Sequence, residues 1–452
     1  MKRLIKELLQ KKKGQLHRRV RVGILGLGIT GKAALDVLLG LGDAVDITVY
    51  PIAAQDTPKT DRAKVGSPDR ITDDVLIASP SVRRERICIP EGTDVISDYS
   101  LLFDSNPERL FSVSGSDGKS TTTAIASLLL SPTFPTLFTG GNLGTPLWLA
   151  ERSSDAFLLE LSSFTLRYSL PHRGRAALTN VTPNHLDWHE SLDEYIDTKL
   201  GLVYSADEPV LSLDDSISEA AAREMHSFAL VSSHLSREDI LRRYRTEHTV
   251  TVENGSIFRD TELMLPTRAV RRNEAHNIQN LTLAIALSTG YATRERICEV
   301  AESFDGLAQR CRITEKDGIS YISSSIDTTP ERTATTLNSL GRRVKIILGG
   351  RGKGLSYEPL SKPLAQYAER IALYGDAGRE MLGLIESDAD LYTIPHAHFS
   401  KMKDAFDYAA DGAGAGDTVL LSPAATSYGE FRDYLERGRA FLDYVDKKHT
   451  KI

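Results

Sequence analysis

The amino-acid sequence predicts an α/β protein of three domains, each built on a mainly parallel sheet covered by helices. The chain has 452 residues, enough for about three domains of average size. Short apolar runs typical of buried strands alternate with helical stretches along most of its length, and this alternation favours parallel sheets. Two of the strand–helix steps contain glycine-rich turns at positions where such folds bind phosphate groups.

The composition excludes several classes of protein. Hydrophobic residues make up 41% of the chain and charged residues 26%, as in ordinary globular proteins. The net charge of -6 argues against nucleic acid as a partner, because neutralising phosphates requires a basic surplus. Cys88, Cys298 and Cys311 are far apart and odd in number, a pattern that forms neither a disulfide framework nor a Cys-x-x-Cys metal site. We therefore expect a cytoplasmic protein.

The first 19 residues are rich in lysine and arginine, and their apolar residues have helical spacing. Such a segment could be a basic amphipathic helix that touches acidic lipid or a solvated N-terminal extension, and we expect the extension. No long apolar stretch follows it, so the sequence predicts neither a signal peptide nor stable membrane insertion. The basic residues are Lys2, Arg3, Lys6, Lys11, Lys12, Lys13, Arg18 and Arg19, and the apolar ones are Leu4, Ile5, Leu8 and Leu9.

Residues 20–107 are expected to form the first domain. An apolar strand at residues 20–25 leads into the pattern Gly26-x-Gly28-x-x-Gly31, and a helix follows from 33 to 39. Backbone amides in such a turn can approach a diphosphate at the helix N-terminus. The next strand, residues 46–50, ends in Tyr50 and Pro51, where an NAD site would have an acidic residue for the ribose. The sequence thus argues against NAD and leaves another nucleotide diphosphate open.

A second glycine-rich turn, GSDGKST at residues 115–121, lies in the predicted second domain, residues 108–310. It follows an apolar strand at 110–114 and precedes a helix at 121–130. Two glycines let the loop curl around a phosphate, Lys119 supplies positive charge, and a hydroxyl can hold Mg²⁺. Because an acid beside phosphate is repulsive, Asp117 must face away. The context indicates a nucleotide-phosphate loop, although the spacing is shorter than the general pattern.

Polar residues also occur where two further strands of this domain should end. Glu160 closes a strand at residues 156–161, and a carboxylate there is costly unless it meets a cation or metal. His185 follows the strand at 176–180, and His189 lies four residues later. Taken alone, both histidines are expected to be surface or capping residues. Together with the phosphate loop and Glu160, His185 becomes a candidate partner in a Mg²⁺ site.

Several sequence blocks, in this order, resemble the Mur ligase family. The resemblance extends from about residue 20 to about residue 440. Within the family, the serine-rich C-terminal block and the GLGITGK start favour a ligase that adds D-glutamate to UDP-N-acetylmuramoyl-L-alanine. The blocks are GSDGKST, GGNLGTP (140–146), LELSSF (159–164), NVTPNHLDWH (180–189), Lys199, HNIQN (276–280), GLAQR (306–310), LGGRGKG (348–354) and LLSPAATSYGEF (420–431).

The resemblance implies a Rossmann-like N-terminal domain that holds the UDP part, a central P-loop domain that holds ATP, and a Rossmann-like C-terminal domain, residues 311–452, that brings the amino acid. ATP would phosphorylate the substrate carboxylate, and the amine of D-glutamate would attack the acyl phosphate. The protein would act as a monomer in peptidoglycan precursor synthesis. Its catalytic residues would be Lys119, which contacts the transferred phosphate, His185 and Lys199.

The resemblance also implies the ligands and contacts of the site. Ser120 and Glu160 would bind one Mg²⁺, and His185 would help hold a second together with Lys199, carbamylated by CO₂, which requires a buried, uncharged amine. ATP would contact Gly115, Ser116, Asp117, Gly118, Lys119, Ser120, Thr121, Asn277, Asn280 and Arg310. The UDP-substrate would contact Gly28, Ile29, Thr30 and Asn142. The carboxylates of the amino acid would contact Thr328, Lys353, Ser427 and Tyr434.

The chain departs from the family pattern in its last third. An Asp-Ser-Lys or Asp-Ser-Ile stretch is replaced by Ser324-Ser325-Ile326, so either Asp327 substitutes for the missing acid or the ATP contacts are weaker. Ile326 also removes one cation from the amino-acid pocket. Three alternatives therefore stay open: another amino-acid ligase of the family, including the folylpolyglutamate type, a degenerate nucleotide-binding regulator, and a Rossmann dehydrogenase.

Overall fold

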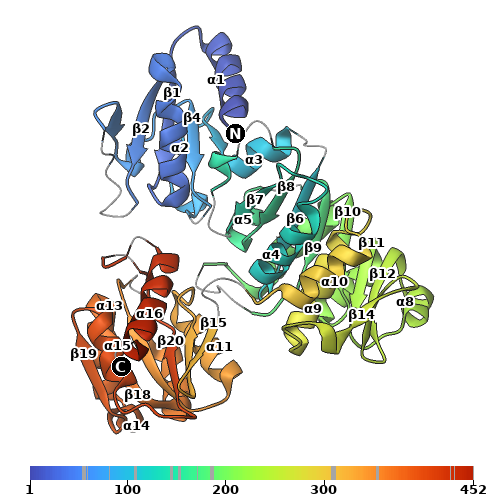
Figure 1. Cartoon of the computed structure of the whole chain (residues 1–452). Coiled ribbons are helices and arrows are strands. Elements are labelled where there is room, and N and C mark those ends of the chain that lie inside the picture. The colour runs from blue at the N-terminus through green and yellow to red at the C-terminus, as the bar shows by residue number, and fades with distance from the viewer. Residues whose placement is uncertain are drawn as a thin grey trace. The chain divides into compact units, whose positions relative to one another are not determined.

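The structure is a computed structural model that describes residues 1–52, 58, 60–80, 82–105, 109–142, 146–150, 154–169, 172–183, 188–306, 312–352, 356–427, 429–431 and 433–450. The chain divides into two compact units, Met1–Phe304 and Asp305–Ile452. The first unit contains two sheets and the second contains one (Figure 1). Helices accompany all three sheets, and most neighbouring strands in each sheet are parallel. This confirms the predicted α/β class.

The first sheet has five parallel strands in the order β3-β2-β1-β4-β5. The strand order reverses between β1 and β4, and ligands of such sheets bind at the carboxyl ends of the strands at this point. The elements are β1 Val20–Leu25, α2 Ile29–Leu39, β2 Val45–Tyr50, β3 Ala63–Val65, β4 Val75–Ala78, β5 Asp94–Ile96 and α3 Asp98–Asp104.

The N-terminal segment packs against this sheet. Helix α1 (Lys2–Leu16) buries Ile5 and Leu9 in the same core as the strands, and the Met1 amine donates a hydrogen bond to the Ala150 carbonyl oxygen at 3.2 Å. Lys12 forms an ion pair with Asp94 at 2.8 Å. The expectation of a solvated extension is therefore wrong, because the four-residue spacing of the apolar residues directs them onto the sheet. Within the described ranges, no helix is long and apolar enough to cross a bilayer.

The second sheet has nine strands in the order β14-β13-β12-β11-β10-β9-β6-β8-β7. Its strands are parallel from β12 to β7, and β12, β13 and β14 form an antiparallel edge. The strands are β6 Leu110–Ser114, β7 Phe138–Gly141, β8 Phe157–Glu160, β9 Arg175–Leu178, β10 Glu208–Ser212, β11 His226–Ser232, β12 Arg245–Glu253, β13 Ser256–Arg259 and β14 Glu262–Pro266. The strands expected at 110–114, 156–161 and 176–180 are confirmed to within two residues.

Helices cover this sheet, and α4 and α9 pack against each other (Figure 1). A four-residue turn, 115–118, connects β6 to α4, which begins at Lys119 rather than at residue 121 as expected. The helices are α4 Lys119–Leu130, α5 Ser163–Arg167, α6 Leu192–Ser205, α7 Ser216–Glu224, α8 Arg237–Arg243, α9 Ala275–Leu287 and α10 Arg294–Ser303.

The second unit contains a six-stranded sheet in the order β15-β16-β20-β17-β18-β19, in which only β15 is antiparallel to its neighbour among the described strands. The strand expected at 418–421 is confirmed to the residue. The strands are β15 Arg312–Lys316, β16 Ile319–Ser323, β17 Val344–Gly349, β18 Ala368–Tyr374, β19 His396–Phe399 and β20 Thr418–Leu421. The helices are α11 Pro330–Leu340, α12 Ser361–Tyr367, α13 Gly375–Ser387, α14 Ala389–Tyr392, α15 Met402–Ala410 and α16 Tyr434–His449.

Short 3₁₀ turns join some of these elements: η1 Gly42–Ala44, η2 Pro68–Arg70, η3 Arg84–Arg86, η4 Leu147–Leu149, η5 Thr267–Ala269 and η6 Glu358–Leu360. The predicted domain boundaries at 107/108 and 310/311 lie outside the described residues and stay predictions.

Candidate functional site

The turn between β6 and α4 requires glycine at two positions. Gly115 has a φ angle of 139° and Gly118 one of 79°, values that disfavour residues with a side chain. A Cβ atom on Gly115 would lie 1.9 Å from Thr179 Oγ1, and one on Gly118 would lie 2.2 Å from Asn280 Oδ1. The loop thus passes too close to its neighbours for any other residue at these two positions.

Polar contacts from the segment after β9 hold the backbone of this loop. Thr179 Oγ1 donates a hydrogen bond to the Asp117 carbonyl oxygen at 2.6 Å, and the Asp117 amide donates to Asn180 Oδ1 at 2.9 Å. Ser116 Oγ donates to the Thr182 carbonyl oxygen at 2.9 Å. The side chain of Asp117 is exposed. No side chain in the described part of the chain caps the N-terminus of α4, so its amides can bind an anion such as phosphate.

Two lysine side chains donate hydrogen bonds to carbonyl oxygens of the loop. Lys119 Nζ donates to Ser116 at 2.6 Å, and Lys199 Nζ, from α6, donates to Gly115 at 2.7 Å. Lys199 is 2% exposed. Burial, together with the nearby charge of Lys119, lowers the pKa of Lys199 well below its usual value, while Asp117 and Glu160 oppose the shift. The buried position is what a lysine that reacts as a neutral amine requires.

Glu160, at the end of β8, has one carboxylate oxygen in a position that fits a metal ion. The side chain is 1% exposed, and Oε1 accepts a hydrogen bond from Asn142 Nδ2 at 2.8 Å. Oε2 is buried and has no hydrogen-bond partner among the described residues. Such an oxygen is costly unless a cation meets it. No group of three His, Cys, Asp or Glu side chains gathers in the described part of the chain, whereas Mg²⁺ needs only one or two carboxylates and completes its shell with water and phosphate.

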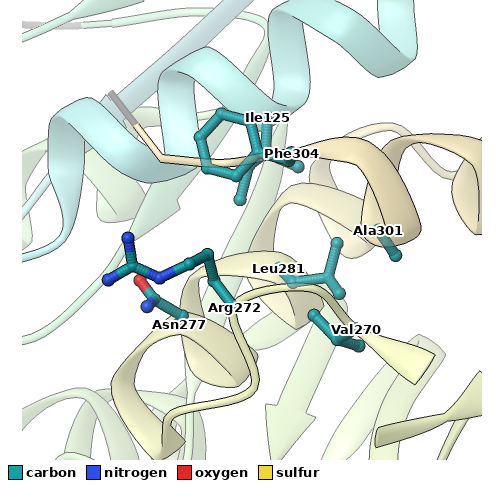
Figure 2. A pocket seen from close by; sticks show the side chains of 7 residues that line it. All are labelled: Ile125, Val270, Arg272, Asn277, Leu281, Ala301 and Phe304. Atoms are coloured by element: carbon teal, nitrogen blue, oxygen red, sulfur yellow. The ribbon is translucent and has the colours of Figure 1, made fainter. Parts of the chain in front are cut away.

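A small, mostly apolar pocket lies between α4, α9 and α10 (Figure 2). Figure 2 shows Asn277 and Arg272 next to each other on one side of the pocket, whose other lining side chains are apolar. Asn280, one turn further along α9, is buried, and its Oδ1 accepts a hydrogen bond from Thr122 Oγ1 at 3.3 Å. The pocket residues are Ile125, Val270, Arg272, Asn277, Leu281, Ala301 and Phe304. Of these seven residues, only Asn277 is among the ATP contacts that the sequence predicts.

The first sheet presents a glycine turn at the carboxyl end of β1. Gly26 has a φ angle of 81°, and a Cβ atom on Gly31 would lie 2.0 Å from the Gly26 carbonyl oxygen. Gly28 precedes α2, whose N-terminus lacks a side-chain cap, and Thr30 is half-buried. Ile29 begins the helix, but its side chain lies outside the described part. This turn can therefore bring backbone amides close to a diphosphate.

Tyr50, at the end of β2, belongs to the core of this sheet. It is 2% exposed, and its hydroxyl donates a hydrogen bond to Asp73. Burial and the Asp73 carboxylate raise the pKa of Tyr50 to about 12. A Cβ atom on Gly23 would lie 2.8 Å from the ring, so the ring packs flat over a glycine of β1. The tyrosine that replaces the expected acid thus has a structural contact of its own.

In the second unit, Tyr434 is the first residue of α16, Ser427 lies after β20, and Thr328 lies between β16 and α11. Ser427 is buried and Thr328 is half-buried. The carbonyl oxygen of Tyr434 accepts a hydrogen bond from Ser325 Oγ at 2.8 Å. The fully buried Arg437, one turn later, donates to the Ser325 carbonyl oxygen at 2.8 Å. These contacts tie the segment after β16 to α16.

Asp327 lies inside a cluster of hydroxyl groups. Its carboxylate accepts hydrogen bonds from Thr336 Oγ1 at 2.8 Å and Ser422 Oγ at 2.7 Å. Ser324 also bonds to it, and burial raises its pKa. The Asp327 carboxylate is therefore bound within its own unit, and this counts against the idea that it replaces the missing acid in orienting a nucleotide.

His185, Arg310 and Lys353 lie outside the described residues, so the structure does not place them. His189, expected as a surface or capping residue, is 3% exposed and hydrogen-bonded at both ring nitrogens. That expectation is wrong, because the ring packs among the aromatic side chains Phe164, Trp188 and Tyr195.

Comparison with known proteins gives a consistent result. Residues 113–288 match the Mur ligase middle domain. The UDP-N-acetylmuramoylalanine–D-glutamate ligase of Marinobacter nauticus is 31% identical over 94% of this chain and 98% of its own, and that of Ruminiclostridium cellulolyticum is 29% identical over 94% and 96%.

Two solved structures have a similar fold. One is a UDP-N-acetylmuramate–alanine ligase from Thermotoga maritima, with a TM-score of 0.57, 16% identity and coverage of 95% of this chain and 100% of that one. The other is a pseudomurein peptide ligase type C from Methanothermus fervidus, with a TM-score of 0.52, 14% identity and coverage of 94% and 100%.

Proposed function

The chain belongs to the Mur ligase family, and we propose that it is the ATP-dependent ligase that joins D-glutamate to UDP-N-acetylmuramoyl-L-alanine in peptidoglycan precursor synthesis. Relatives with that name match it over nearly their whole length. The structural observation that carries the proposal is the gathering of Lys119, Lys199 and the buried carboxylate of Glu160 around one phosphate loop.

Amide formation from a carboxylate needs activation, because a carboxylate is a poor electrophile. The γ-phosphoryl group of ATP passes to the substrate carboxylate, which gives an acyl phosphate and ADP. The amine of D-glutamate then attacks the carbonyl carbon, and phosphate leaves from the tetrahedral intermediate. The protein contributes mainly positioning and neutralisation of charge. Lys119 and the uncapped N-terminus of α4 suit the role of contacting the phosphates.

The metal ligands form part of the same proposal. Ser120 and Glu160 would hold one Mg²⁺. Oε2 of Glu160 supports this assignment, because it has no hydrogen-bond partner among the residues that the structure describes. His185 and a carbamate on Lys199 would help hold a second. Bound Mg²⁺ neutralises the charge of the phosphates. The buried amine of Lys199 fits carbamate formation, because only an unprotonated amine attacks CO₂.

In this proposal each of the three domains binds one substrate: the UDP-substrate, ATP or the amino acid. The adenine would contact Asn277 and Asn280 on α9, with Arg310 as a further contact. The UDP-substrate would meet Gly28, Ile29, Thr30 and Asn142. D-Glutamate would meet Thr328, Lys353, Ser427 and Tyr434. A monomer in the cytoplasm, where ATP is abundant, completes the proposal.

The test is product identification. The full chain is incubated with ATP, Mg²⁺, UDP-N-acetylmuramoyl-L-alanine and a panel of amino acids, and products are identified by mass. We expect an amide with D-glutamate and equimolar phosphate, and no product from the variant Lys119→Ala. An amide with another amino acid would assign the chain to a different ligase of the family. Nucleotide binding without any amide would favour a regulator.

A further inference from the structure

Three polar side chains near the phosphate loop form a continuous set of hydrogen bonds, here called the His189 relay. Nε2 of His189 lies 2.9 Å from Ser163 Oγ, and Nδ1 lies 3.0 Å from Glu194 Oε1. Ser163 is the first residue of α5, and Glu194 is in the first turn of α6. Ser163 and His189 are each 3% exposed. The relay therefore joins the helix that follows Glu160 to the helix that carries Lys199.

The surroundings of the relay fix the roles of its groups. Glu194 also accepts a hydrogen bond from the Glu190 amide at 2.8 Å and forms an ion pair with Arg167. An ionised carboxylate only accepts hydrogen bonds, so Nδ1 of His189 donates to Glu194, and in the neutral ring Nε2 then accepts from the Ser163 hydroxyl. A serine, a histidine and an acid in line can activate a nucleophile, but a nucleophile must be accessible to its substrate, and Ser163 is buried at the start of α5. The relay is therefore suited to holding neighbours in place.

The neighbour that the relay holds is Tyr195. The rings of His189 and Tyr195 meet edge to face, with centroids 5.1 Å apart and an interplanar angle of 75°. The Tyr195 hydroxyl lies 2.7 Å from Ser116 Oγ in the phosphate loop, and Lys199 Nζ lies 4.9 Å from the centroid of the Tyr195 ring. One buried tyrosine thus contacts the loop and Lys199, and the histidine supports its ring from behind.

We propose that His189 is a positioning residue for the ligase reaction. Together with Ser163 and Glu194 it keeps Tyr195 in place, and through Tyr195 it keeps the phosphate loop and Lys199 in the geometry that phosphoryl transfer needs. The inference rests on the proposed function for its effect on turnover, but not for its effect on nucleotide binding. Groups that orient a reacting residue from behind affect rates strongly, since small displacements misalign the reacting atoms.

The test compares two buried histidines. His189→Phe keeps an aromatic ring against Tyr195 but removes both hydrogen bonds. The control is His172→Phe, because His172 is fully buried, packs edge-on against Phe103 at 5.0 Å, and has no hydrogen-bond partner for either ring nitrogen among the described residues. Both variants alter packing, but only the first alters the relay. Ser163→Ala removes the bond to Nε2, and Glu194→Gln removes the negative charge that faces Nδ1. These two variants serve if His189→Phe fails to fold.

Four quantities are measured for each variant: the melting temperature, kcat, the KM for the UDP-substrate, and the Kd for a fluorescent ADP in Mg²⁺. We expect His189→Phe to lower kcat roughly 10- to 100-fold and to weaken ADP binding, with the KM for the UDP-substrate unchanged. Ser163→Ala and Glu194→Gln should show smaller losses, and His172→Phe should change only the melting temperature. Relay variants that keep both kcat and the Kd for ADP would overturn the proposal. If the wild type makes no amide, the proposed function fails, and ADP affinity alone still decides on the relay.

Discussion

The Nζ atom of Lys199 lies 2.7 Å from the carbonyl oxygen of Gly115, so the amine of α6 is bonded to the first residue of the phosphate loop. The side chain is buried, and burial with the neighbouring charge of Lys119 lowers its pKa. A neutral amine has a free electron pair and can attack CO₂. This contact therefore places a buried lysine with a lowered pKa at the phosphate-binding turn, where its proposed carbamylation can be tested.

Lys199→Ala should lower the rate of ATP-dependent phosphate release by roughly 100-fold or more, because the variant cannot form the carbamate that we propose as a metal ligand. Added short carboxylic acids, such as acetate, should restore part of the activity by filling the space with a carboxylate. Lys199→Arg, which keeps a cation but cannot be carbamylated, should be inactive and should not respond to the acids. Near-normal phosphate release in Lys199→Ala would contradict the assignment.

Glu160→Gln should raise the Mg²⁺ concentration needed for half-maximal activity by about tenfold, since an amide replaces the carboxylate whose Oε2 lacks a described partner. Activity is measured against Mg²⁺ concentration at saturating ATP. The matched control is Glu208→Gln, which removes a carboxylate that pairs with Arg175 at 2.6 Å in the same sheet. An equal shift in both variants would show a general effect of charge and not a metal ligand.

Gly118→Ala should abolish binding of ATP to the phosphate loop. The added Cβ would lie 2.2 Å from Asn280 Oδ1, and the φ angle of 79° disfavours alanine as well. Gly290→Ala separates the two effects, because Gly290 has a φ angle of 85° but no atom within 4 Å of an added Cβ. Both variants should lose about 1–2 kcal/mol of stability, but only Gly118→Ala should lose affinity in a nucleotide titration. Equal affinities would refute the contact.

The sequence predicts the elements of the fold whose pattern lies within a short, continuous run of residues. The strands at 110–114 and 418–421 are mainly apolar and buried along their whole length, because both faces of these parallel strands are covered. The sequence predicts the N-terminal helix but wrongly places it in solvent. Its lysines suggested a solvated segment, and only the packing of Ile5 and Leu9 against the first sheet shows that the helix belongs to the core.

The same distinction applies to the candidate site. The phosphate loop could be recognised because its glycines, lysine and hydroxyl are consecutive. Tyr195 and His189 were missed as supporting residues, since Tyr195 meets Ser116 across 79 positions of the chain and no local pattern marks that contact. For the acid missing at Ser324 the sequence leaves two possibilities open, substitution by Asp327 or weaker ATP contacts. The hydroxyls of Thr336 and Ser422, which count against substitution, meet the Asp327 carboxylate only in the folded unit.

Asp98 should make folding stability depend on pH. It is 1% exposed at the start of α3, and burial raises its pKa to about 7, although the amides of Tyr99 and Trp148 partly oppose the shift. Because the unfolded value is about 4, the folded state binds the proton more tightly. The stabilisation is complete below about pH 4 and is lost as the pH rises towards about 7, by an amount on the order of a few kcal/mol. Asp98→Asn keeps the shape but cannot ionise, so its melting temperature should fall less than that of the wild type between about pH 5 and about pH 8. If the melting temperatures of the two proteins fall by the same amount across this pH range, Asp98 does not titrate there.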